Sequence, residues 1–231
     1  MDKNVSRDAC SCMGPSSRLA ESICLAIVIT LAYVTIPSGL VKFGWRWVPE
    51  GVRFSSINSW STWAFAGLQL AIGLSLALSA PVRSGLRIGN IRSHWKKVLL
   101  VCGLPVAVAG IVYPLLPFRP FADQPITVWI LSPLAQDLVF IGYLYGCFEG
   151  SAAGFLHKRV RIRWSLVLTA ALFSLHHFSG YGYWPAGFVT LQIVYTFVGL
   201  LLIGLSRQWT GSILYAAATH TCVNLIAWAI P

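Results

Sequence analysis

The sequence contains few charged residues. Only 10% of its 231 residues are Asp, Glu, Lys or Arg, and only seven are acidic, whereas 56% are hydrophobic. A typical soluble domain is about 25% charged and ~45–50% apolar, and a domain of this length could not bury so much apolar surface in water. The mean hydropathy is +0.70. This composition argues against a soluble enzyme, a nucleic-acid-binding domain and a disordered chain, and it indicates a membrane protein.

The sequence also lacks the common cysteine and metal motifs. Its six cysteines form no C-x-x-C pair, and no H-E-x-x-H run occurs. The first absence argues against a disulfide framework or a zinc-thiolate site, and the second removes the usual zinc-protease helix. We therefore expect no cofactor, although other zinc ligands are present.

Long apolar stretches dominate the chain. A helix needs about 20 mostly apolar residues to cross a bilayer. No linker, internal repeat or second domain interrupts the pattern. We therefore predict an all-α fold, a polytopic transmembrane helix bundle that forms a single domain over 19–231 after a polar tail over 1–18. Seven stretches are candidates, roughly 19–37, 60–80, 98–116, 126–148, 162–178, 185–205 and 211–230.

The basic residues predict how the bundle is oriented. With seven spans, 13 of the 17 Lys and Arg residues fall on the side that holds the N-terminus, and four fall on the other side. Lys and Arg are enriched in cytoplasmic loops. The pattern predicts an N-terminus inside and a C-terminus outside, in the cytoplasmic (inner) membrane of a prokaryote. The side that carries most of the Lys and Arg residues is then expected to contact the lipid bilayer rather than nucleic acid.

One acidic residue lies deep inside an apolar stretch. An Asp at the centre of a membrane helix costs about 2.5–3.5 kcal/mol, so Asp137 suggests a function and needs a partner. His177 and His220 lie in or at the ends of later stretches, and Asn224 follows His220 by one helical turn. We predict that three helices bring these four side chains into one interior pocket.

These residue types favour metal-free peptide hydrolysis. An acid and a histidine can remove a proton from water, and histidine and asparagine donors can stabilise the oxyanion that forms next. The same residues leave two other sites open. Zinc could bind Asp137, His177 and His220, and haem could bind the two histidines as axial ligands.

Three segments resemble the motifs of a known family. They have the order and spacing of the three motifs of the CPBP intramembrane proteases, which include type II CAAX prenyl endopeptidases and Abi-like immunity proteins. The resemblance covers about residues 98–231 and implies cleavage of a peptide bond in a membrane-anchored protein. The segments are PLAQDLVFIGYLY at 133–145, LFSLHHF at 172–178 and WTGSILYAAATHTCVNL at 209–225.

The first motif departs from the family pattern. Gln136 replaces the first glutamate, Asp137 the second, and Ile141 the arginine. In the family, the first glutamate and the second-motif histidine are thought to activate water, while the third-motif histidine and asparagine stabilise the oxyanion. The resemblance assigns these roles to Gln136, His177, His220 and Asn224.

Because glutamine is no useful base, we hypothesise that Asp137 activates water and that Gln136 positions it. The missing arginine leaves Asp137 without an ion-pair partner, which favours this role. The pocket should open towards the outer half of the bilayer, which suits an exported substrate with a hydrophobic C-terminal sorting or anchor segment. The alternative is a catalytically silent relative that acts as an immunity or scaffold protein.

Overall fold

The computed structural model describes residues 15–45, 60–115, 126–152, 154–157, 162–180 and 185–229. Within these ranges the fold is all-α, as predicted, apart from one short antiparallel hairpin of β1 (Phe155–His157) and β2 (Ile162–Arg163). The helices are α1 (Pro15–Trp45), α3 (Trp60–Ser79), α4 (Pro81–Ser84), α5 (Trp95–Val112), α6 (Ile126–Asp137), α7 (Tyr145–Ser151), α8 (Trp164–His176), α9 (Ala186–Thr210) and α10 (Leu214–Ala229), with the short turns η2 (Tyr113–Leu115) and η4 (His177–Gly180) and the π-helix η3 (Leu138–Leu144).

Each predicted apolar stretch contains a helix. Four segments of the described residues are long and apolar enough to cross a membrane, namely Ser17–Leu40, Trp95–Leu115, Ile126–Ser151 and Ala186–Thr210. The other three stretches form the helices α3, α8 and α10, which are not among these four segments. The structure thus shows four candidate spans, while the count of seven and the orientation of the termini stay predictions.

The predicted polar tail is too long at its C-terminal end. Helix α1 already begins at Pro15, inside the predicted tail of 1–18, and residues 1–14 lie outside the described residues. Proline suits the first turn of a helix because the backbone N–H groups there have no partner within the helix, so the N–H that proline lacks is not missed. Ser16, Ser17 and Arg18 therefore belong to the first turn of α1 rather than to the segment that precedes it.

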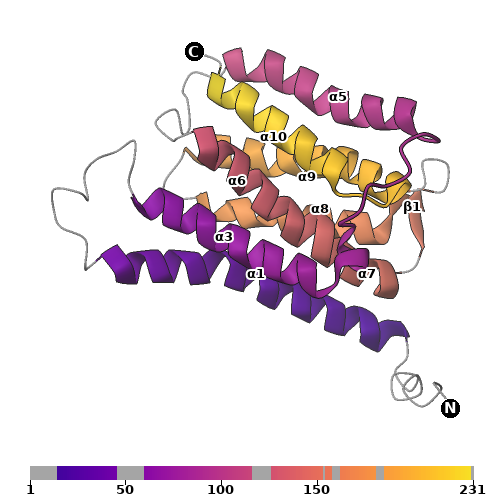
Figure 1. Cartoon of the computed structure of the whole chain (residues 1–231), viewed down its shortest axis with the longest axis horizontal. Helices are drawn as coiled ribbons and strands as arrows, with labels where there is room; N and C mark the ends of the chain where they lie inside the picture. The colour runs from indigo at the N-terminus through magenta and orange to yellow at the C-terminus, as the bar shows by residue number, and fades with distance from the viewer. Residues whose placement is uncertain are drawn as a thin grey trace.

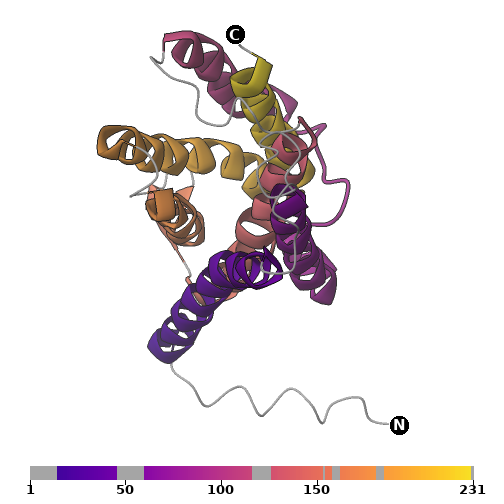
Figure 2. The same ribbon diagram turned by 90° about the vertical axis from the view of Figure 1, so that its left-hand side faces the viewer.

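Successive long helices run in alternating directions (Figure 1). The start of α1, the hairpin and the turn between α9 and α10 therefore lie at one end of the bundle, and α10 finishes at the other. The two views place α5 and α1 on opposite sides of the molecule (Figure 2). Most of the described basic residues collect at the first end, which we call the basic end: Arg18, Arg83, Arg87, Arg92, Lys96, Lys97, Arg163 and Arg207.

The main core is built around the π-helix η3. Five consecutive residues from Leu138 to Gly142 are buried there. Tyr33 of α1 and Phe173 of α8 pack edge-on against Phe140. A Cβ on Gly142 would lie 3.3 Å from the carbonyl oxygen of Ser84, so the short helix α4 approaches η3 closely. The core thus fixes the position of the segment that follows Asp137.

A tight turn at the basic end determines where α10 begins. Gly211 ends α9 in the left-handed region, at φ +76°. The Thr210 hydroxyl accepts a hydrogen bond from the Ser212 backbone N–H at 3.2 Å, and the Ser212 hydroxyl accepts one from the Leu214 N–H at 3.2 Å. Arg87 Nε donates to the Gly211 carbonyl at 3.1 Å. The turn therefore determines how far each residue of α10 lies from the basic end of the bundle.

We expect Gly211→Ala to lower the stability of the protein. The alanine Cβ would be strained at this φ and would overlap the Arg87 guanidinium, which costs about 1–3 kcal/mol. Thermal unfolding of the purified protein in detergent measures the effect.

Gly187→Ala is the matched control, since Gly187 lies in α9 with nothing within 4 Å of its Cβ position. It should leave the midpoint unchanged or raise it slightly. Equal midpoints for both variants would contradict the role of the turn.

Candidate functional site

The candidate site is built around a hydrogen bond between Asp137 and His220. Asp137 is the last residue of α6 and is fully buried, and Nδ1 of His220 lies 3.1 Å from its Oδ1. An ionised carboxylate only accepts hydrogen bonds, so with Asp137 ionised, Nδ1 of His220 carries the proton and the lone pair lies on Nε2. The second oxygen, Oδ2 of Asp137, has no hydrogen-bond partner among the described residues.

Small residues allow the two helices to approach. Helix α6 packs against α10 on one side and α3 on the other. Ala135 of α6 and Ala216 and Ala217 of α10 are buried, and small side chains let membrane helices lie close together. On the other side of α6, Gly73 of α3 faces the carbonyl of Ala135. Close packing thus brings a short aspartate within reach of a histidine 83 positions away in the chain.

The chain changes helix type directly after Asp137. Residues Leu138–Leu144 form a π-helix, which is rare and is often found at functional sites. The wider turn alters the angle between Asp137 and the side chains that follow it. One of these, Phe140, stacks on the His176 ring with centroids 5.4 Å apart. The π-helix therefore lets one segment supply both the buried acid and the aromatic wall beside the histidines.

A histidine pair lies beside the Asp137–His220 pair. The Phe173 carbonyl lies close to Nδ1 of His176 and 3.1 Å from Nδ1 of His177. Because a carbonyl only accepts, both rings carry their proton on Nδ1 and have a lone pair on Nε2. The Phe173 ring also contacts all three histidine rings, at 5.2, 5.2 and 5.6 Å from His176, His177 and His220. Phe173 thus connects the histidine pair to the acid–histidine pair.

The structure therefore brings together most of the predicted residues. Asp137 and His220 are in contact, and His177 joins them through Phe173. Asn224 lies one turn beyond His220 on α10 and Gln136 lies beside Asp137, both half-buried. Neither forms a hydrogen bond with the pair among the described residues.

Sequence reasoning missed two side chains near the site. His176 packs on Phe140 and lies 4.0 Å, ring to ring, from His177. The adjacent histidines at the end of an apolar stretch could have indicated it. Tyr33 is fully buried against Phe140. No signal in the sequence could have indicated that residue, since α1 precedes the three motifs.

The zinc alternative on Asp137, His177 and His220 gains no support from the geometry. Among the described residues, no group of three or more His, Cys, Asp and Glu side chains is arranged to hold a metal ion.

One comparison with known proteins gives a match. Residues 120–226, a little under half of the chain, match the model of a family described as type II CAAX prenyl endopeptidase Rce1-like. The match includes α6, η3, α8 and α10 as far as residue 226, and thus every residue of the candidate site except Tyr33. No curated protein and no solved structure matches the chain.

The Asp137–His220 hydrogen bond should be visible without any activity assay. In protein labelled with ¹⁵N-histidine, we expect His220 to show the neutral form with its proton on Nδ1, the form that Asp137 stabilises. Asp137→Ala should abolish this signal, because a free imidazole in water favours the other tautomer.

Glu149→Ala is the control, since Glu149 pairs with Arg163 at the basic end. It should leave the His220 signal unchanged. A His220 signal that Asp137→Ala does not alter would show that the hydrogen bond does not fix the tautomer.

Proposed function

We propose that the protein is an intramembrane endopeptidase, because residues 120–226 match the model of the Rce1-like family of type II CAAX prenyl endopeptidases. It would hydrolyse a peptide bond in a membrane-anchored protein. The observation that carries this proposal is the buried Asp137–His220 pair, which lies inside the family segment. Asp137 itself lies in Ile126–Ser151, one of the four segments that are long and apolar enough to cross a membrane.

The geometry favours His220 as the base and Asp137 as the residue that positions it. Asp137 accepts a hydrogen bond from the Nδ1–H of His220, so the Nε2 lone pair can take a proton from water. The buried carboxylate then stabilises the imidazolium that forms, as the aspartate of a Ser-His-Asp triad does. This role differs from our sequence-based hypothesis, in which Asp137 itself activated the water.

The proposed reaction needs no group beyond water and the protein's own side chains. Water loses a proton to His220 Nε2 as its oxygen bonds to the scissile carbonyl carbon, and the carbonyl oxygen becomes an oxyanion. When this intermediate collapses, the C–N bond breaks and His220 returns the proton to the departing amine. The products are a carboxylic acid and an amine, and His220 is neutral again; the acid then gives its proton to the amine or to water and becomes a carboxylate.

The remaining residues have supporting roles in this proposal. Asn224 lies one turn from His220, and its amide can donate a hydrogen bond to the oxyanion. His177 has its Nδ1 proton engaged by the Phe173 carbonyl, so its Nε2 can accept a hydrogen bond from the attacking water. Gln136, beside Asp137, can donate to the substrate or to the water but cannot act as a base.

The substrate we propose is an exported protein with a hydrophobic terminal segment. Asp137 and His220 both lie within apolar helices rather than in a loop, with His220 near the middle of α10. A peptide bond can reach Asp137 and His220 only if its segment of the substrate enters the membrane region. A hydrophobic anchor or sorting segment can do so.

We expect loss of His220 or Asp137 to abolish processing. A general base contributes about 10²–10⁴-fold to rate, so His220→Ala and Asp137→Asn should each reduce cleavage by at least ~100-fold. The measurement is terminal-peptide mass spectrometry of the membrane and exported proteins of the native host, which carries each variant at equal expression.

The matched control is Cys222→Ala, an exposed residue two positions from His220 on the same helix. In the proposal, one protein keeps an extra hydrophobic segment in both site variants and is processed normally in the control. If all variants match the wild type while a deletion strain has a phenotype, the protein is a silent relative and the peptidase proposal is wrong.

Restoring the family's glutamate tests which residue handles the proton. If His220 is the base, Gln136→Glu should not raise the cleavage rate by more than about twofold, because the new acid does not contact the imidazole. Cleavage of the substrate identified above is the readout, and Gln136→Ala is the control for loss of the amide. A large gain with Gln136→Glu would show that position 136 is the natural site of the base and would overturn the role of the Asp137–His220 pair.

A further inference from the structure

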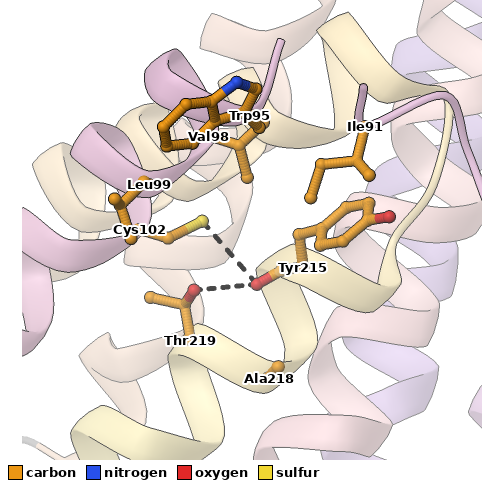
Figure 3. A pocket seen from close by; sticks show the side chains of 8 residues that line it. All are labelled: Ile91, Trp95, Val98, Leu99, Cys102, Tyr215, Ala218 and Thr219. Atoms are coloured by element: carbon orange, nitrogen blue, oxygen red, sulfur yellow. Dashed lines mark hydrogen bonds between the residues drawn. The ribbon is translucent and has the colours of Figure 1, made fainter. Parts of the chain in front are cut away.

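An apolar groove lies between α5 and α10, away from the candidate site. Its volume is about 320 Å³, within the range of ~300–1,000 Å³ typical of small-molecule sites. Figure 3 shows Trp95 and Ile91 at one end and Ala218 and Thr219 at the other. Its lining is almost entirely apolar and is formed by Ile91, Trp95, Val98, Leu99, Cys102, Tyr215, Ala218 and Thr219.

Two polar side chains of the groove wall, Cys102 and Thr219, interact within the protein. The Thr219 hydroxyl donates to the Tyr215 carbonyl at 2.8 Å, and the Cys102 thiol lies 3.8 Å from the same oxygen. Figure 3 shows both interactions converging on this carbonyl. The wall therefore presents hydrocarbon to whatever occupies the groove, and a water-rich or hydrogen-bonding ligand would gain little there.

The groove is open to the outer surface of α5, where apolar side chains are exposed. Helix α5 is one of the four candidate spans, and Leu99, which lines the groove, is 66% exposed. Leu100 and Leu104 beside it are exposed as well. An acyl chain of the surrounding membrane can therefore enter from the side without crossing a polar barrier.

Positive charge surrounds one end of the groove. The Lys96 ammonium lies 5.5 Å from the centroid of the Trp95 ring, and Lys97 lies 5.8 Å from that of Trp209. Arg92 is exposed one position beyond Ile91. Neither the segment 80–115 nor α10 contains an acidic residue. The groove thus combines an apolar channel with a cationic, aromatic rim at the basic end.

We propose that this groove is a binding site for an anionic phospholipid. One acyl chain would lie against Leu99, Cys102 and Ala218, and the negatively charged headgroup would contact Lys96 and the basic residues near it. Anionic lipids attract basic residues at the membrane surface, and tryptophan favours the same depth. The inference does not depend on the proposed peptidase activity, since the groove does not include Asp137 or His220.

Native mass spectrometry of the full-length protein in detergent tests this site. We would add phosphatidylglycerol or phosphatidylcholine with identical palmitoyl and oleoyl chains, at equal concentrations. One phosphatidylglycerol should be retained by the wild type at activation energies that remove phosphatidylcholine. Equal retention of the two lipids, or of neither, would overturn the proposal.

Two neighbouring leucines on α5 form a matched pair for the apolar part. Leu99→Trp should fill the groove and reduce phosphatidylglycerol binding at least tenfold. Leu100→Trp changes a residue of similar exposure, 68%, that does not line the groove, and it should bind as the wild type does. Ala218→Trp fills the groove from α10 and should reproduce the loss. Equal binding by Leu99→Trp and Leu100→Trp would show that the lipid lies on the general surface.

The charged rim is tested by removing one positive charge. Lys96→Gln should reduce the preference for phosphatidylglycerol over phosphatidylcholine by about fivefold, the effect of one surface Lys near an anionic lipid. Arg18→Gln removes one charge from the same end of the bundle, at the start of α1, and should leave the preference unchanged. An equal loss in both variants would show that only the net charge matters and would overturn the specific headgroup site.

Discussion

The buried carboxylate of Asp137 is the constraint on which the rest of the site depends. A charge in an apolar interior is costly unless it is paired and hydrogen-bonded, and this one is fully buried. His220 provides the pairing through Nδ1, but only if α6 and α10 lie close together and start at the right depth. The small residues between the helices provide the closeness, and the Thr210–Gly211–Ser212 turn provides the depth. The Asp137–His220 hydrogen bond thus depends on both the packing of α6 against α10 and the turn that begins α10.

The family segment and the rest of the chain contribute differently. Residues 120–226 contain the acid, the histidines and the turn, while α1, α3 and α5 lie outside them. Helix α1 adds Tyr33 to the aromatic core, and α3 supports α6 through Gly73. Helix α5 instead forms one wall of the apolar groove with α10. Helix α10 borders both the site and the groove. Thr219 and His220 are neighbours in the sequence, but Thr219 lines the groove and His220 belongs to the candidate site.

The sequence predicts the broad features of this molecule for physical reasons. Long apolar stretches must become helices in a membrane, since an unpaired backbone is too costly there, and all seven predicted stretches contain a helix. Asp137 is conspicuous because an acid is expensive in such a stretch, and the positions of His177 and His220 follow from motif spacing. The spacing of the motifs does not predict which of these two histidines contacts Asp137. Whether Asp137 meets His177 or His220 depends on how the helices rotate and cross, and that depends on packing over the whole bundle.

The π-helix after Asp137 is a second feature that the sequence does not reveal, because no residue type marks it. A π-helical turn holds one residue more than an α-helical turn with the same ends. The segment Leu138–Leu144 can therefore be regarded as a helix that carries one surplus residue, held in place by the aromatic core around Phe140. Removing one residue there would let an ordinary α-helix form between the same ends, with Asp137 and α7 still in phase. If the same residues instead formed an α-helix with none removed, Asp137 would turn about 100° around the helix axis relative to α7. The π-helix thus lets the chain carry one residue more than regular geometry requires, while Asp137 and the helix that follows it stay in phase.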